Sequence, residues 1–151
     1  MQRQACGILR DVYKMSDGEI IFTMEQICFP GDYWSLDSVL SQLARPNVIY
    51  SLIKSEKGEY AGYILGSIVA DEAEIYRVGV LPQFRRQALG KRLMEAFISL
   101  CKGKAERIFL EVRSKNSGAI ALYKCFCFEQ IAVRKNYYND DDAVIYRLEM
   151  E

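Results

Sequence analysis

Residues 84–93 read "FRRQALGKRL", a stretch that follows an apolar, strand-like run and opens a helix. Because the backbone dipole is already positive at a helix N-terminus, cationic side chains crowded there are unfavourable unless an anion docks beside them. A strand–loop–helix junction also aims backbone N–H groups at one point, and Gly90 omits a side chain where an anion would approach. The stretch predicts an anion site, with a solvated basic helix face as the alternative. The cationic residues are Arg85, Arg86, Lys91 and Arg92.

Length and composition indicate an ordinary globular protein. The chain has 151 residues, half of them hydrophobic, with a formal net charge of zero. Such a chain can bury a core without metal or disulfide staples, and it has no global field to attract nucleic acid or an anionic membrane. From Glu74 onward Lys and Arg outnumber Asp and Glu, so an anionic ligand is expected on the second half. We predict one domain over residues 1–151, with no nucleic-acid or membrane partner.

Targeting, cysteine and metal signals are negative. No apolar run has signal-peptide character or approaches the roughly 20 residues that span a bilayer, which predicts a cytoplasmic protein. Five cysteines without a CxxC pair favour reduced, mostly buried thiols over a disulfide framework. The chain contains no histidine, and the thiol and carboxylate spacings predict no metal site. The cysteines are Cys6, Cys28, Cys101, Cys125 and Cys127.

Periodicity and turn signals predict a mixed α/β (α+β) domain in the order β-α-α-β-β-β-α-β-α-β-β. A capping box of Ser16 and Glu19 opens the first helix, and Asn116 or Ser117 caps the last. Short turns make the three middle strands antiparallel, and the apolar run "RIFLEV" predicts a strand at a covered, central position of the sheet. Strands are expected over 6–14, 47–54, 60–70, 73–81, 107–112, 128–138 and 143–150, and helices over 16–29, 35–44 and 117–126, with one more helix that buries Leu89, Leu93, Phe97 and Leu100 and ends near Gly103.

Residues 110–126, "LEVRSKNSGAIALYKCF", place Glu111 near the end of an apolar strand and Tyr123 in the helix that follows. Together with the preceding strand and phosphate-type loop, they resemble the GNAT superfamily of acetyl-CoA-dependent N-acetyltransferases. Within that superfamily, residues 74–98, 108–138 and 143–150 look like the bacterial ribosomal-protein-alanine acetyltransferases. The resemblance covers roughly the second half of the chain. Before Glu74 only the order of elements agrees.

The resemblance implies a GNAT fold, with a mixed, mostly antiparallel central sheet flanked by helices. It also implies acetyl-CoA as cosubstrate and direct acetyl transfer to an N-terminal α-amine, here the alanine of a ribosomal protein. The superfamily's Arg/Gln-x-x-Gly-x-Gly/Ala signature maps onto Arg85, Ala88 and Gly90, and the amides of residues 86–91 would cradle the CoA pyrophosphate. The implied cofactor-binding residues are Val78, Gly79, Val80, Arg85, Arg86, Gln87, Ala88, Leu89, Gly90, Lys91 and Asn116, and the Val80 N–H would face the thioester oxygen.

The same resemblance makes Glu111 the general base and Tyr123 the general acid, and it places Tyr137 and Tyr138 beside the acceptor groove. A carboxylate is a sufficient base, because an N-terminal α-amine has a pKa near 8, about two to three units below that of lysine. Hydrogen bonding to the departing sulfur is the more modest role for Tyr123. The acidic run at residues 140–142 would attract a cationic N-terminus or serve solubility alone.

Two residues depart from the superfamily pattern. Ala88 replaces a usual glycine, and because alanine is favourable at the start of a helix, we expect a right-handed conformation there. Cys127 replaces the glycine after the Tyr123 helix, so either it tolerates a left-handed backbone or the cap is built differently.

Other functions stay open. One alternative is a GNAT enzyme for a small amine, a polyamine or a lysine side chain, which a groove walled off by Tyr137 and Tyr138 would favour. The other is a CoA-binding regulatory module that has lost catalysis.

Overall fold

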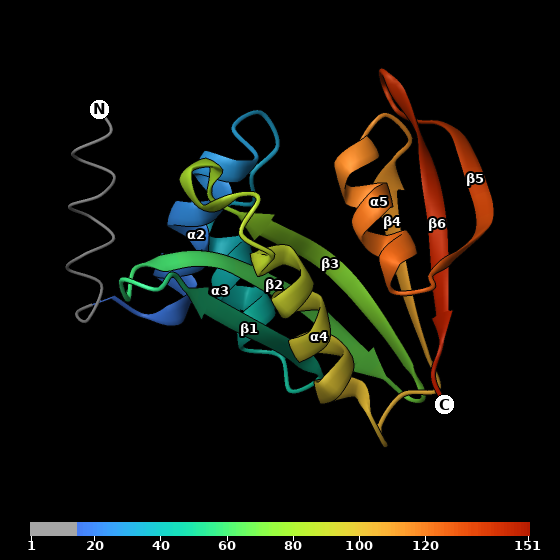
Figure 1. Ribbon diagram of the computed structural model, residues 1–151, viewed down its shortest axis with the longest axis horizontal. Coiled ribbons are helices and arrows are strands. Elements are labelled where there is room, and N and C mark those ends of the chain that lie inside the picture. Colours follow the sequence, from blue (N-terminus) through green and yellow to red (C-terminus); the bar gives the residue numbers. More distant parts are fainter. Residues whose placement is uncertain (1–14) are drawn as a thin grey trace.

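The computed structural model describes residues 15–151, which fold around one six-stranded sheet with the strand order β1-β2-β3-β4-β6-β5 (Figure 1). Neighbouring strands are antiparallel except β3 and β4, which are parallel. The strand expected over 6–14, and Cys6 within it, lie outside the described residues. The elements are α2 (Asp17–Cys28), α3 (Leu36–Leu43), β1 (Val48–Lys54), β2 (Tyr60–Val69), β3 (Glu72–Val80), the short 3-10 helix η2 (Pro82–Phe84), α4 (Leu89–Cys101), β4 (Arg107–Arg113), α5 (Ser117–Cys125), β5 (Glu129–Tyr138) and β6 (Asp141–Glu149).

Helices pack on both faces of the sheet. Helices α4 and α5 cover one face, and α2 and α3 cover the other face over β1, β2 and β3 (Figure 1). The buried face of α4 repeats every four residues, at Leu89, Leu93, Phe97 and Cys101. Leu100, which we expected on that face, is 38% exposed because Cys101 takes the last buried position.

Strands β3 and β4 separate along their length, as Figure 1 shows. Their parallel pairing runs only from Glu72 opposite Arg107 to Ile75 opposite Leu110. At that point the β2–β3 register shifts, and Tyr76 is the extra residue of a bulge. Bulges bend the strand that contains them, so β3 turns away from β4. The separation leaves backbone groups of both strands without a strand partner.

Strand β4 is central, as predicted, and one of its faces is more deeply buried than the other. Ile108, Leu110 and Val112 are buried under the α4 and α5 face, while the residues that alternate with them are only half-buried. Glu111 is one of these alternate residues. Its side chain therefore points to the face opposite α5.

The predicted N-cap residues are confirmed. The Ser16 Oγ accepts a hydrogen bond from the Glu19 N–H at 3.2 Å, and the Asn116 Oδ1 accepts one from the Ala119 N–H at 3.2 Å. Both helices therefore begin at the residues that the sequence indicates.

The thiols are less buried than expected. Cys101 is buried and Cys28 is half-buried, but Cys125, the last residue of α5, and Cys127, on the turn that follows it, are exposed. In the part of the chain from Met15 onward, no helix is long and apolar enough to cross a membrane, and no three His, Cys, Asp or Glu side chains are grouped to hold a metal ion.

Candidate active site

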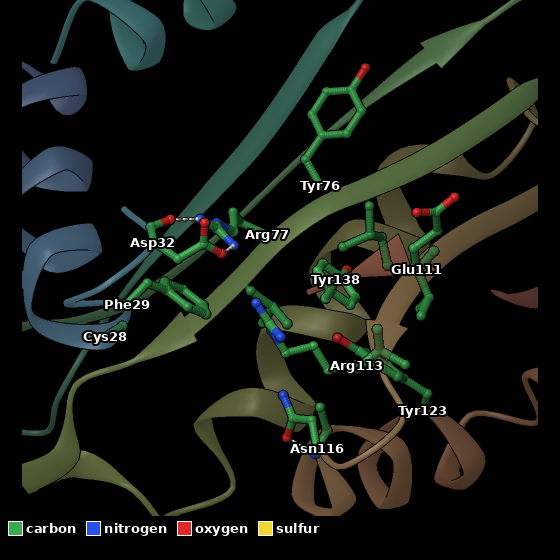
Figure 2. A pocket seen from close by; sticks show the side chains of 15 residues that line it. Cys28, Phe29, Asp32, Tyr76, Arg77, Glu111, Arg113, Asn116, Tyr123 and Tyr138 are labelled. Atoms are coloured by element: carbon green, nitrogen blue, oxygen red, sulfur yellow. Dashed lines mark hydrogen bonds and ion pairs between the residues drawn. The ribbon is translucent and has the colours of Figure 1, made fainter. Parts of the chain in front are cut away.

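Two cavities meet where β3 and β4 separate. The first, about 360 Å³ in volume, lies between these strands, and we call it the gap pocket (Figure 2). The second, about 650 Å³, lies against the loop that opens α4, and we call it the loop pocket. Val78, Asn116 and Ala119 line both, so the two cavities lie side by side. The gap pocket is also lined by Cys28, Phe29, Asp32, Ile75, Tyr76, Arg77, Leu110, Glu111, Val112, Arg113, Tyr123 and Tyr138, and the loop pocket by Val80, Phe84, Arg85, Arg86, Ala88, Leu89, Gly90, Lys91, Gly118 and Leu122.

The ladder between β2 and β3 decides which way the β3 backbone points. The Leu81 N–H donates to the Ala61 carbonyl at 2.8 Å, and the next pair is Gly62 opposite Val80. In an antiparallel ladder, bonded and non-bonded pairs alternate, so the Val80 N–H points away from β2. By the same alternation the Val78 backbone also points into the gap. Two of the three expected backbone positions therefore face the gap, and Gly79 faces β2.

Gly79 is a glycine for reasons of packing. A Cβ atom there would lie 2.8 Å from the Tyr63 ring and 3.3 Å from the Cys28 Sγ. Tyr63 is completely buried, so its ring cannot move aside. Burial also raises the pKa of the Cys28 thiol to about 11, which keeps it protonated near neutral pH.

The loop that opens α4 corrects one prediction. Ala88 has φ 61° and ψ 18°, a left-handed conformation, instead of the right-handed one that we expected. Arg86 is also left-handed, with φ 64°. Helix propensity was the wrong criterion, because Ala88 precedes the helix as its N-cap. Left-handed residues at positions 86 and 88, with Gln87 between them, turn successive N–H groups toward one side, a geometry that binds anions.

The backbone amides of the same loop are available to a ligand. Arg92 is the first residue of α4 whose N–H finds a helical carbonyl, that of Ala88, at 3.2 Å. Among the hydrogen bonds between described residues, none uses the N–H groups of residues 86–91 as donors. All residues of this run except Gln87 line the loop pocket, and their amides are not tied up by other described residues, as an anion site requires.

The basic side chains of the loop divide between two surfaces. Arg85, Arg86 and Lys91 line the loop pocket, and the Arg85 Nε donates to the Val80 carbonyl at 3.1 Å. Gln87 and Arg92 instead line a separate hollow beside Lys54. Gln87, which the resemblance implies as a cofactor-binding residue, is therefore not among the residues that line the loop pocket.

Glu111 lies at the edge of the gap pocket with its carboxylate on the α2 side of the sheet (Figure 2). Its Oε1 is 3.4 Å from the Arg134 Nη2, and its side chain is 28% exposed. Arg134 is 55% exposed. Ion pairs this open to water contribute little to stability, so the pair does not lock the carboxylate.

Tyr123 enters the gap pocket from α5. Burial raises the pKa of its hydroxyl to about 12, so the group is a hydrogen-bond donor at any ordinary pH. The end of α5 fixes its position: the Phe128 N–H donates to the Tyr123 carbonyl at 3.3 Å, and the Cys127 N–H donates to the Lys124 carbonyl at 3.1 Å. This is a Schellman cap, and Cys127 accepts the left-handed backbone with φ 67°. The Phe128 ring then packs 6.0 Å from the Tyr123 ring.

Asn116 lies where the two cavities join. Because its Oδ1 caps α5, the side-chain amide group is left to donate toward a ligand.

The final hairpin behaves only partly as predicted. Tyr138 lines the gap pocket and packs 4.0 Å from the Arg113 guanidinium. Tyr137 is 53% exposed and is not among the residues that line the gap pocket. The gap pocket is therefore not walled off by both tyrosines.

The acidic run of the hairpin is used inside the protein. Asp140 pairs with Arg113 at 2.6 Å, and this hydrogen bond lowers the pKa of the Asp140 carboxyl. Asp141 accepts hydrogen bonds from the Ser114 hydroxyl and, at 2.9 Å, from the Lys115 N–H, while Asp142 accepts one from the Asn136 N–H at 2.9 Å. The run therefore joins the hairpin to the end of β4.

Sequence reasoning missed the wall opposite Glu111. Phe29 and Asp32, from the segment between α2 and α3, line the gap pocket, together with Arg77 of β3 (Figure 2). The sequence predicts helices over 16–29 and 35–44 and assigns no role to the segment that joins them. The available signal was Arg77 itself, a charged residue in the middle of an apolar strand.

Comparisons with known proteins agree with this geometry. Residues 19–126 match the Acetyltransferase (GNAT) family. The chain is 36% identical over 99 residues to the ribosomal protein bS18-alanine N-acetyltransferase of Escherichia coli K12, covering 62% of this chain and 67% of that protein. The crystal structure of the Escherichia coli ribosomal-protein-S18-alanine N-acetyltransferase superposes with a TM-score of 0.83 at 29% identity, over 91% and 90% of the two chains. Arabidopsis thaliana NAA60, crystallised in complex with acetyl-CoA, shares the fold with a TM-score of 0.77 at 17% identity, over 90% and 94%.

Proposed function

The chain belongs to the GNAT family of acetyltransferases, and from this premise we propose that it transfers the acetyl group of acetyl-CoA to the N-terminal α-amine of a protein, specifically the N-terminal alanine of a ribosomal protein. One observation carries the proposal. The Glu111 carboxylate and the protonated Tyr123 hydroxyl line the gap pocket, and Val80, whose N–H points away from β2, lines the loop pocket beside it. The gap continues into a loop whose amides are available to an anion.

The loop pocket fits CoA. Its unused amides at residues 86–91 suit a diphosphate, and the side chains of Arg86 and Lys91 add charge-assisted hydrogen bonds. From there the pocket runs past Asn116 to the backbone of Val78 and Val80, a path that suits the extended pantetheine arm. Bound acetyl-CoA supplies the activated acyl carbon and a thiolate leaving group.

The residues around the gap have distinct parts in the proposed reaction. Glu111, directly or through a water, takes the proton that an α-ammonium must lose before its nitrogen can form the new C–N bond. The Val80 N–H donates to the thioester oxygen, and a single well-placed donor of this kind is typically worth about 3 kcal/mol. The Tyr123 hydroxyl donates to the sulfur as the C–S bond breaks.

Two observations favour a protein acceptor. The Escherichia coli relatives named above act on the alanine of ribosomal protein bS18, and one of them superposes over nine-tenths of this chain. Tyr137 is turned outward, so the two tyrosines do not close the pocket together. A pocket closed by both would have favoured a small-amine acceptor. A ribosomal protein acceptor would be met in the cytoplasm.

The test measures thiol release from acetyl-CoA in the presence of different acceptors. We expect release with peptides that begin with alanine, and mass spectrometry should place the acetyl group on the α-nitrogen. An N-terminally blocked copy of each peptide, spermidine and free lysine should give at most background release. Release with spermidine or lysine alone would show that the acceptor is a small amine and not a protein N-terminus. CoA binding without any release would indicate a regulatory module.

A further inference from the structure

Arg77 is the most heavily engaged cation near the gap pocket. It projects from β3 toward α2, and its side chain is only 15% exposed. Its Nε donates to the Glu25 Oε1 at 3.0 Å, and Glu25 is completely buried in α2. One end of the guanidinium is thereby held by a carboxylate that cannot reach water.

The rest of the guanidinium holds the segment between α2 and α3. The Arg77 Nη2 donates to the Asp32 carbonyl, and the Nη1 lies 3.5 Å from the Asp32 Oδ2 (Figure 2). The guanidinium carbon is 4.2 Å from the centre of the Phe29 ring and 5.5 Å from that of Trp34. Arg77 therefore holds the segment at three residues, through cation–π contacts with both rings and through a hydrogen bond and an ion pair with Asp32 between them.

This segment is one wall of the gap pocket. Phe29 and Asp32 line the pocket on the side across from Glu111 and Tyr138 (Figure 2). The next residue of β3 after Arg77 is Val78, whose backbone points into the gap. One strand therefore carries both the backbone that faces the proposed thioester and the cation that fixes the opposite wall.

We propose that Arg77 is a positioning residue that fixes the segment Phe29–Trp34 against β3 and thereby sets the distance between the acceptor wall and the thioester. This inference rests on the function proposed above. Arg77 does not touch the reacting atoms in this arrangement. Its contribution is to the binding of the acceptor, so its loss raises the KM for the acceptor and spares acetyl-CoA.

Arg77→Lys is the informative variant. The ammonium keeps a positive charge beside Glu25, so the buried carboxylate is not left without a counter-ion. Lysine lacks the planar fork, however, and cannot at once reach Glu25, bind Asp32 and stack on two rings. The matched control is Arg107→Lys, because Arg107 also pairs with several carboxylates but lies at the far end of β4.

Trp34 is the single tryptophan of the chain and provides a readout that needs no acceptor. In Arg77→Lys we expect acrylamide to quench Trp34 fluorescence at least about twice as strongly, and the acceptor KM to rise about tenfold, which corresponds to the loss of one charge-assisted hydrogen bond. The dissociation constant for acetyl-CoA and kcat should stay within about twofold. Arg107→Lys should change none of these quantities.

The outcomes distinguish the positioning role of Arg77 from the proposed acetyltransferase function. Unchanged Trp34 quenching, an unchanged acceptor KM, or a parallel loss of acetyl-CoA affinity in Arg77→Lys would overturn the positioning role. Failure of the wild-type protein to acetylate any alanine-initiated peptide would instead contradict the proposed function, and Trp34 quenching would still report whether Arg77 holds the segment.

Discussion

The Glu111 carboxylate lies 3.4 Å from the Arg134 guanidinium, at the border between the gap pocket and the sheet face opposite α5. The pair is open to water and contributes at most about 1 kcal/mol to stability. An acceptor amine can therefore displace Arg134 from the Glu111 carboxylate at a small cost in free energy.

Glu111→Gln should lower kcat by about 10² or more, the usual contribution of a general base, with acetyl-CoA affinity nearly unchanged. The matched control is Glu74→Gln, which alters a carboxylate on the neighbouring strand that is not among the residues lining the gap pocket. Steady-state kinetics with a saturating alanine-initiated peptide measures both variants. Equal turnover in wild type and Glu111→Gln would remove this carboxylate from the mechanism.

Tyr123→Phe should slow the chemical step, because the departing sulfur loses its hydrogen-bond donor. Tyr146→Phe is a suitable control, since the Tyr146 ring is also buried and lies 6.5 Å from that of Tyr123. A single-turnover experiment separates chemistry from product release. A Tyr123→Phe enzyme as fast as the control would show that Tyr123 has a structural role alone.

The alkaline pH dependence of stability should also report on Tyr123. Burial raises the pKa of this hydroxyl to about 12 in the folded protein, above its value in the unfolded chain. The neutral form is then favoured by folding, so this contribution is complete below about pH 10 and is lost as the pH rises toward 12. Wild type should lose about 2–3 kcal/mol more of its unfolding free energy over this range than Tyr123→Phe does. Parallel curves from urea titrations at each pH would contradict the burial of an ionisable hydroxyl.

Ala88→Gly should raise the melting temperature, because glycine occupies the left-handed region without the Cβ clash that costs alanine about 1 kcal/mol. For a protein of this size that corresponds to about 2–4 °C. Ala96→Gly, in the interior of α4, should do the opposite, since glycine there loses helix propensity. A destabilised Ala88→Gly protein would show that the left-handed backbone is not a source of strain.

Arg86→Gln combined with Lys91→Gln should weaken CoA binding about tenfold or more, through loss of charge-assisted hydrogen bonds to the phosphates. Affinity for acetylpantetheine, which lacks the diphosphate, should stay within about twofold. Arg92→Gln, which alters a side chain outside the loop pocket, serves as the control. Calorimetric titration with both ligands measures the difference, and equal weakening for both would place the diphosphate elsewhere.

The sequence alone determined the features that depend on near neighbours. The Ser16 cap, the Asn116 cap and the order of elements from Asp17 onward follow from residues a few positions apart, whose hydrogen bonds and periodicity act locally. The Schellman cap that places Tyr123 beside Phe128 also spans only one turn, but the sequence left open whether Cys127 would accept its left-handed backbone.

Tertiary structure alone decided the shape of the site. The gap exists because β3 and β4, which are far apart in the chain, pair over only four residues before a bulge at Tyr76 turns β3 away. The left-handed backbone of Ala88 and the contacts of Arg77 with residues 29–34 depend on what surrounds them in space. Long-range pairing and side-chain packing set these contacts, and no local pattern encodes them.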